Sequence, residues 1–301
     1  MSTETREPVI LSNGHAFLEG VRWHDGDAYA SDFHKKQVLR WPGGDGEPEV
    51  IIELEDEPSG IDWTPEGVLV ISSQVDRKLL KVIDGEAQEF ADLNEYAGGN
   101  ANDLCIDGQG RSWVGNFGWD VYTDPVIKPA TLLRVDPDGS IHPVAEGIEC
   151  PNGIAITDDE KTIYVAETFA ARILAFDIEA DGSLSNRRVW ASFGEKTWTE
   201  LPQMLASTTL LPDGIALDAE GAIWATDCHG SGVTRVAEGG EVLDYVSSAP
   251  DATFSVGLSR GESPQMFMAT TFPFGGGDPW TEHKSKMRRV PVDVPGAGYP
   301  A

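Results

Sequence analysis

The sequence predicts an all-β protein, namely a six-bladed β-propeller whose ring is closed by the N-terminal strand. A two-strand unit recurs six times along the chain, and each copy is followed by a third strand of similar pattern. The 301 residues also include 33 Gly and 19 Pro, which favours short strands joined by tight turns. Six units of four antiparallel strands would use residues 1–301 as one domain.

The repeated unit is clearest between Leu211 and Asp227. An acidic residue precedes a short apolar strand, a tight acidic turn follows, and a second apolar strand completes the pair. Alternating apolar residues on both sides of such a turn are typical of a β-hairpin. Each blade is expected to start with one such unit, near residues 19, 59, 103, 152, 213 and 256.

Each unit continues into a third strand, which we expect at residues 38–41, 79–82, 132–135, 173–176, 233–236 and 287–290. A fourth strand follows in five units, as at residues 49–54 and 242–246, but the sixth unit lacks one. A spare strand lies at the other end of the chain, at residues 8–11. We predict that it completes the sixth blade, because closure of the ring hides strand edges that would otherwise stay unpaired.

The charge and composition of the chain restrict its partners. The formal net charge is -28, from 50 acidic and 22 basic residues, and such a field repels phosphate backbones and anionic lipids. No segment reaches the roughly 18 apolar residues of a membrane span, and residues 1–8 lack the apolar core of a signal peptide. We expect a cytoplasmic protein with a small-molecule partner and without nucleic-acid or membrane partners. The sequence leaves the oligomeric state open.

The three cysteines are Cys105, Cys150 and Cys228. They are an odd number and lie far apart, which favours reduced thiols over a disulfide framework. Cys150 and Cys228 fall near the expected mouth of the channel, but neither has a paired base in the sequence. We therefore interpret both as packing residues.

Oxygen-bearing side chains occupy equivalent positions just before three of the innermost strands. They are Glu19, Asn152 and Asp213, in the first, fourth and fifth units. Taken singly, an Asp or Asn before Gly is most often a turn former. At one channel mouth, however, converging carboxylates repel each other unless a cation lies between them. Oxygen ligands favour one divalent cation, calcium first, with magnesium, manganese or zinc as alternatives.

Loops on the same face carry the expected substrate-binding side chains. Three connections are long, at residues 117–130, 190–211 and 271–286, and are interpreted either as functional lids or as apolar cover over the channel. His34 also falls on a mouth loop, where a histidine can bind substrate, move a proton or simply be solvated. The side chains expected to contact substrate from these loops are Phe117, Trp119, Asp120, Phe169, His229 and Phe272.

Four segments of the chain resemble the SMP-30/gluconolactonase/luciferin-regenerating-enzyme-like family. In order they are LEGVRW at 18–23, NDL at 102–104, PNGI at 151–154 and PDGIALD at 212–218. The resemblance spans about residues 18–290 and implies a six-bladed propeller with a divalent cation in its channel and lactonase activity. It implies that Glu19, Asn152 and Asp213 ligate the cation and that Asn102 contacts the substrate. It also implies that Asp213 is the catalytic acid/base.

One departure from that family bears on the substrate. Its sugar-lactonase members carry an arginine two residues before the channel asparagine, where this chain has Asn100, which we also expect at the substrate site. Together with the aromatic loops, this predicts metal-assisted hydrolysis of a lactone less polar than gluconolactone. Two alternatives remain: a phosphotriesterase or other ester hydrolase on the same metal site, and a non-catalytic propeller that binds a ligand or regulates a partner.

Overall fold

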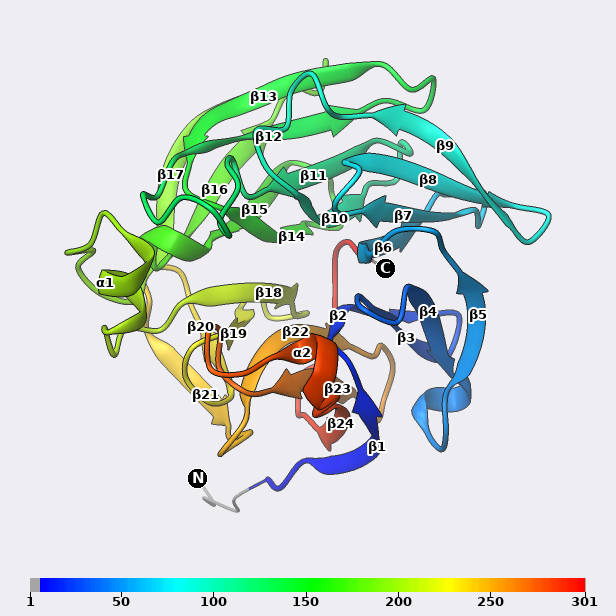
Figure 1. Ribbon diagram of the computed structural model, residues 1–301, viewed down its shortest axis with the longest axis vertical. Coiled ribbons are helices and arrows are strands. Elements are labelled where there is room, and N and C mark those ends of the chain that lie inside the picture. The colour runs from blue at the N-terminus through cyan, green and yellow to red at the C-terminus, as the bar shows by residue number, and fades with distance from the viewer. Residues whose placement is uncertain (1–5, 301) are drawn as a thin grey trace.

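The structure, a computed structural model, describes residues 6–300 and contains six four-stranded antiparallel sheets arranged around a channel (Figure 1). This arrangement confirms the predicted six-bladed β-propeller. The expectation about the N-terminal segment, residues 1–8, falls in part on residues 1–5, which lie outside the described residues. Among the described residues, no helix is long and apolar enough to cross a membrane.

The first five blades each consist of four strands that follow one another in the chain and in the sheet. Blade 1 contains β2 (Leu18–His24), β3 (Asp27–Asp32), β4 (Gln37–Trp41) and β5 (Glu49–Glu53), and blade 2 contains β6 (Pro58–Trp63), β7 (Leu69–Ser73), β8 (Lys78–Ile83) and β9 (Glu86–Asp92). Blade 3 contains β10 (Ala101–Ile106), β11 (Ser112–Asn116), β12 (Ala130–Val135) and β13 (Ile141–Ile148). Blade 4 contains β14 (Pro151–Ile156), β15 (Thr162–Glu167), β16 (Arg172–Ile178) and β17 (Leu184–Ser192), and blade 5 contains β18 (Pro212–Leu217), β19 (Ile223–Asp227), β20 (Val233–Val236) and β21 (Val242–Val246).

The sixth blade is built from both ends of the chain, in the order β1-β24-β23-β22. Its outer strand β1 (Val9–His15) pairs antiparallel with β24 (Ser285–Pro291), and the remaining strands are β22 (Ala252–Leu258) and β23 (Gln265–Thr271). This confirms the predicted ring closure. β1 runs beyond the predicted residues 8–11, because two register shifts let its irregular second half keep pairing with β24.

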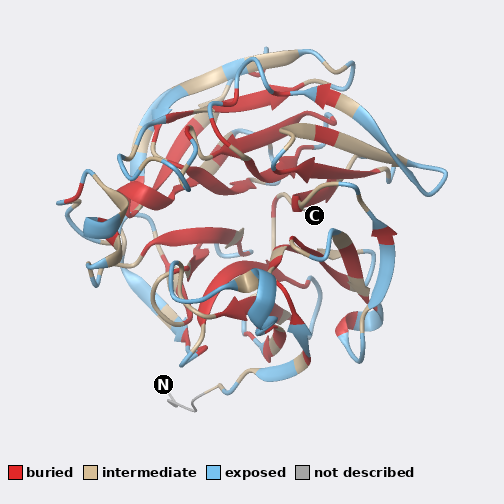
Figure 2. Ribbon diagram, viewed as in Figure 1, coloured by how far each residue is buried: buried red, intermediate tan, exposed pale blue. Residues whose placement is uncertain are grey.

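The hydrophobic core is divided among the blade interfaces. Six clusters of buried apolar side chains in the described chain each join two neighbouring blades, and a seventh lies beneath the loops at the channel mouth. Figure 2 shows the same division, with buried residues on the inner strands and exposed residues along much of the outer ones. The alternating apolar residues of the repeat therefore pack blade against blade.

The innermost strands share an irregularity at the channel mouth. In each blade the register between the first and second strand shifts within the first residues, for example between Pro151 and Ile154 and between Pro212 and Ile215. Such bulges re-aim side chains at the end of a strand. The glycines that follow keep the inner strands close, since a Cβ on Gly153 would lie 2.5 Å from the carbonyl oxygen of Asp213.

The long loops lie together over the channel mouth. The loop from residue 117 to 129 pairs with the loop from residue 193 to 211 through a bridge between Val126 and Glu200. The short helices of the fold lie mostly in or beside these loops: α1 (Leu201–Leu205), α2 (Pro279–Glu282) and η2 (Thr168–Ala170), whereas η1 (Pro42–Gly44) follows β4.

The C-terminal segment crosses the opposite end of the channel, and Figure 1 shows it running to the middle of the ring. Its backbone amides bind turn and strand-end carbonyls of three blades: Tyr299 to Ile156, Ala297 to Leu217 and Gly296 to Ser259. This strap joins blades 4, 5 and 6 on the face away from the long loops, so the two ends of the channel differ in construction.

Candidate active site

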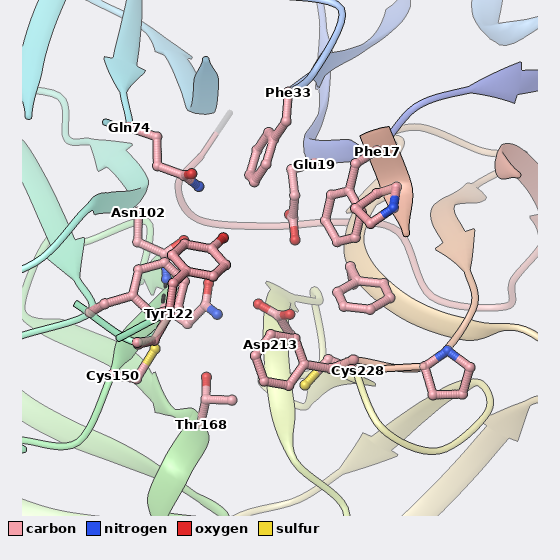
Figure 3. A pocket seen from close by; sticks show the side chains of 18 of the residues that line it. Phe17, Glu19, Phe33, Gln74, Asn102, Tyr122, Cys150, Thr168, Asp213 and Cys228 are labelled. Atoms are coloured by element: carbon pink, nitrogen blue, oxygen red, sulfur yellow. Dashed lines mark hydrogen bonds between the residues drawn. The ribbon is translucent and has the colours of Figure 1, made fainter. Parts of the chain in front are cut away.

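A cavity of about 310 Å³ lies at the channel mouth and is lined by residues of all three long loops. This volume falls in the range of small-molecule sites, about 300–1,000 Å³. Phenylalanines supply much of its wall, and no Lys or Arg among residues 6–300 lines it. Figure 3 shows Glu19, Gln74, Asn102 and Asp213 directed toward a common centre.

Glu19 and Asp213 bring two carboxyl groups to this centre from blades 1 and 5. Asp213 is 6% exposed and lies in the bulge of β18. Burial, followed by the charges of Asp213 and Asp103, raises the pKa of Glu19 well above its ordinary value. Burial and the charge of Asp103 likewise raise the pKa of Asp213. The Asp213 carboxylate therefore destabilises the ionised form of Glu19, and Asp103 destabilises the ionised form of both groups.

Asp213 keeps one oxygen of its buried carboxylate without a hydrogen-bond partner in the described chain. Its Oδ1 is buried and has no partner among the described residues. The side chains of Asn152 and Cys228 face the carboxyl group and act against the rise of its pKa. Since buried polar atoms are almost always paired, an orphaned oxygen directed at a cavity indicates a ligand.

The basic group that acts on Glu19 is already engaged. Arg22 Nη2 lies 2.5 Å from Asp103 Oδ1 and donates to the carbonyl oxygen of Leu104 at 2.8 Å. The Arg22 charge lowers the pKa of Glu19, but its effect is the smallest of those acting on that group. Arg22 thus balances Asp103 and leaves the Glu19–Asp213 pair without a counter-charge of its own.

These residues fit a divalent cation. Glu19, Asp213 and Asn152 supply two carboxylates and an amide oxygen, the hard donors that calcium takes. Among residues 6–300, no three His, Cys, Asp or Glu side chains are placed to hold a metal ion together. The expected set contains only two side chains of those types, and its third donor is an amide.

The structure separates the predicted substrate-binding residues into two groups. Asn102, Phe117, Phe169 and Phe272 line the cavity together with the three expected metal ligands. The other predicted residues, Asn100, Trp119, Asp120 and His229, lie outside its lining.

Three residues of the second group have local roles. Trp119 is buried and donates from Nε1 to the carbonyl oxygen of Asp124, which stiffens its own loop. Asp120 is exposed and accepts from the backbone amide of Tyr122. Asn100 donates to Gln74 Oε1 at 3.4 Å and so contacts a lining residue.

His34, rather than His229, is the mouth-loop histidine that lines the cavity. His34 Nδ1 lies 2.8 Å from Glu57 Oε1, and the imidazole stacks on Trp280 with ring centroids 4.2 Å apart. His229 is half-buried, and its Nδ1 has no partner within the described chain.

The structure confirms that the three described cysteines form no disulfide and shows that two of them also line the cavity. All three described cysteines are free and buried, as expected for reduced thiols. Cys150 and Cys228 also line the cavity beside Asp213 (Figure 3). Burial raises the pKa of both thiols well above the ordinary value, so they face the site as neutral groups.

Sequence reasoning missed several lining residues, and the repeat itself held the signal for some. Gln74 directly follows the second strand of blade 2, a position that faces the mouth in the other blades. Phe254 lies in β22, which begins four residues before the predicted start of that blade. Phe17 precedes β2 and packs against Phe254 with ring centroids 4.8 Å apart.

Comparison with known proteins agrees with this architecture. Residues 17–271 match the sequence model of the SMP-30/gluconolactonase/LRE-like region. The pentonolactonase XacC of Haloferax volcanii is 26% identical over 265 residues, covering 86% of this chain and 82% of that protein. The gluconolactonase of Zymomonas mobilis is 26% identical over 265 residues, covering 82% of this chain and 70% of that protein.

A solved structure shares the fold. Regucalcin from Agrobacterium tumefaciens, described as a calcium-binding protein, superposes with a TM-score of 0.75 at 18% identity. The match covers 98% of this chain and 95% of that one. At this identity the likeness concerns the fold alone.

Proposed function

Because the chain belongs to the SMP-30/gluconolactonase/LRE-like family, we propose that it is a lactonase that uses one divalent cation, calcium first, on lactones less polar than sugar lactones. Two relatives that match over most of this chain are themselves named lactonases. The calcium assignment draws on the oxygen donors of the site, which are two carboxylates and an amide.

The observation that carries the proposal is that two carboxyl groups lie at the centre of the cavity and that no Lys or Arg in the described lining balances their charge. Asp213 Oδ1 has no partner in the described chain, and Glu19 has one described hydrogen bond, from the Gly20 amide. Burying two such groups side by side is costly unless a cation joins them. Glu19, Asn152 and Asp213 would hold this cation, which when bound polarises an ester carbonyl and stabilises negative charge on its oxygen.

The chain's own residues complete the reaction. The Asp213 carboxylate accepts a proton from the attacking water and returns it to the departing alkoxide, so lactone and water give one hydroxy acid. The carboxamide of Asn102, also directed into the cavity, hydrogen bonds to the substrate beside this carboxylate. The phenylalanine walls exclude other water and strengthen these electrostatic contacts.

The character of the walls supports a substrate of low polarity. Phe17 packs against Phe33 and Phe254 in the cavity lining, and Phe169 packs against Phe117 and Phe274. Polyhydroxylated rings need several hydrogen-bonding partners, whereas these side chains offer none. An alkyl or aryl substituent on the lactone ring would instead bury apolar area against them.

A substrate panel tests the proposal. γ- and δ-alkyl lactones, gluconolactone, aryl esters and phosphotriesters are each assayed with added calcium and with a chelator. We expect alkyl lactones to give the highest kcat/KM, and the chelator to abolish turnover until calcium is restored. A preference for gluconolactone would overturn the substrate class, a preference for phosphotriesters would overturn the reaction, and chelator-insensitive hydrolysis would overturn the metal. No turnover of any compound would favour a ligand-binding propeller.

A further inference from the structure

One wall of the cavity carries polar groups that lactone hydrolysis at Asp213 does not use. His34, from the loop after β3, and Gln74, from the loop after β7, both line the cavity. Both are well buried: the His34 side chain is 6% exposed and Gln74 is 3% exposed. In Figure 3 the Gln74 carboxamide points toward the middle of the pocket.

Glu57 joins these two residues into one unit. Its carboxylate Oε1 lies 2.8 Å from His34 Nδ1. Its backbone carbonyl oxygen accepts a hydrogen bond from the backbone N–H of Gln74 at 2.8 Å. The hydrogen bond to His34 lowers the pKa of Glu57, with a further contribution from the Trp280 side chain. Trp280 also stacks on the imidazole. The wall is therefore held from two blades and from the loop that carries α2.

The supporting contacts determine which atoms remain free. A carboxylate only accepts hydrogen bonds, so His34 donates through Nδ1, and in the neutral form of the imidazole Nε2 is an acceptor. Asn100 donates to Gln74 Oε1, which leaves Gln74 Nε2 as a donor. Neither His34 Nε2 nor Gln74 Nε2 hydrogen bonds to another described residue. One acceptor and one donor thus remain free on two residues that line the cavity beside its phenylalanine wall.

We propose that His34 and Gln74 form a specificity subsite for a neutral group on the lactone substituent that both donates and accepts a hydrogen bond, an amide or a hydroxyl. Gln74 Nε2 donates to the oxygen of this group, and its N–H or O–H donates to His34 Nε2. Asn100 and Glu57 are positioning residues that fix the amide and the imidazole. This inference rests on the proposed lactonase function and adds to it a defined substituent.

The charges of the cavity favour a neutral group at this subsite. An anionic substituent would meet Glu57 behind His34 and the Glu19–Asp213 pair across the cavity. A purely alkyl substituent would bury His34 Nε2 and Gln74 Nε2 without partners, which costs free energy. A substituent with an apolar chain and one amide or hydroxyl satisfies both the phenylalanine walls and these two atoms.

Matched α-substituted γ-butyrolactones test the subsite. The substituents are hexyl, hexanoylamino, hexanoyloxy and 1-hydroxyhexyl, which offer respectively no polar group, an amide, an acceptor alone and a hydroxyl. We expect kcat/KM for the amide or the hydroxyl lactone to exceed that of the hexyl lactone about tenfold, with the acyloxy lactone between them. Whichever of the amide and hydroxyl lactones has the higher kcat/KM identifies the group that the subsite prefers.

Substitutions then assign the effect to the two residues. Gln74→Leu and Gln74→Glu remove the donor, and His34→Phe removes the acceptor while keeping an aromatic ring against Trp280. Each should lower the ratio of kcat/KM between the polar and hexyl lactones about three- to tenfold. Asn100→Ala should lower the same ratio less than the Gln74 substitutions do. In the Gln74→Leu background it should cause no further decrease, as expected for a residue that acts by positioning Gln74.

A glutamine remote from the site serves as the control. Gln88→Leu, on the exposed outer strand β9, should leave the ratio unchanged. The proposal is overturned if the wild-type enzyme hydrolyses hexyl and polar lactones equally well, or if folded Gln74 and His34 variants keep the wild-type ratio. Failure of the wild-type enzyme to hydrolyse any of the lactones would overturn the lactonase function as well, so the two failures are distinguishable.

Discussion

Two aspartates at the two ends of the same strand, β18, have opposite surroundings. Asp218, directly after the strand, is fully satisfied: its Oδ1 accepts from the Glu220 and Ala222 amides, and its Oδ2 pairs with Arg235 Nε at 2.7 Å. Asp213, at the mouth end, keeps Oδ1 unpartnered within the described residues. Both carboxylates are buried, at 1% and 6% exposure.

The difference separates structure from function within one repeat. A buried carboxylate with a guanidinium and two amides stabilises its turn. A buried carboxylate beside a second one, with a raised pKa and a free oxygen, destabilises the fold unless a ligand binds. Asp107 repeats the first pattern in blade 3, where it binds Arg111 and Trp113. We therefore propose that the turn end of the propeller contributes stability and that the mouth end contributes chemistry.

The largest effect is expected at the mouth end. Asp213→Asn keeps the shape of the side chain but removes its charge and its capacity to accept a proton. We expect kcat/KM for an alkyl lactone to fall about 10²- to 10⁴-fold, while the protein remains folded. Steady-state kinetics at saturating calcium provide the measurement. A folded Asp213→Asn enzyme with wild-type kinetics would contradict the catalytic role proposed for Asp213.

The turn end should respond in the opposite way. Asp218→Ala leaves two turn amides and Arg235 Nε without their partner, while Arg235 Nη2 keeps Glu220, so the free energy of unfolding should fall by about 2 kcal/mol. Denaturant titration measures this loss. The kcat/KM of the folded fraction should stay within about twofold of the wild type, because the side chain lies on the far side of the blade. A large loss of activity with unchanged stability would contradict the assignment.

A smaller effect is expected from the loop over the mouth. Trp280 is 52% exposed, yet its ring stacks on His34 and meets the edge of Tyr122 with ring centroids 6.4 Å apart. Trp280→Ala should raise KM for alkyl lactones about three- to tenfold with little change in kcat, because it removes an aromatic wall and not a reacting group.

The matched control for Trp280 is Tyr245→Ala, which removes an aromatic side chain of similar exposure, 51%, from the outer strand of blade 5. Its kinetics should equal those of the wild type. If both variants raise KM equally, the change reflects general destabilisation and the three long loops are cover rather than lids.

The fold was predictable because the propeller repeats a local pattern. Apolar alternation on both sides of a Gly- or Asp-containing turn needs no distant information, and six copies of it specify six blades. The positions of Glu19, Asn152 and Asp213 followed from the same repeat, since equivalent residues must face one channel. The structure brings all three to one cavity.

The cavity wall was less predictable, because it depends on which way each loop side chain turns. Trp119 and Trp198 are large aromatic residues of the kind that line a substrate site. Their indole N–H groups instead donate to loop carbonyl oxygens, of Asp124 and Phe169 respectively. Gln74 and His34 reach the cavity through contacts with Asn100 and Glu57, which lie in other blades or other loops. Contacts between side chains that are far apart in the sequence leave no signal in the local pattern of residues.

The central claim is that the Glu19–Asp213 pair is a cation site, and the calcium dependence of stability tests it most directly. The free energy of unfolding is measured for the wild type and Asp213→Asn, each with chelator and with calcium at about 100 times its dissociation constant. We predict that calcium stabilises the wild type by about 2.7 kcal/mol. We also predict that the chelated variant is at least as stable as the chelated wild type and gains little from calcium. Equal stabilisation of both proteins, or none of the wild type, would contradict the account.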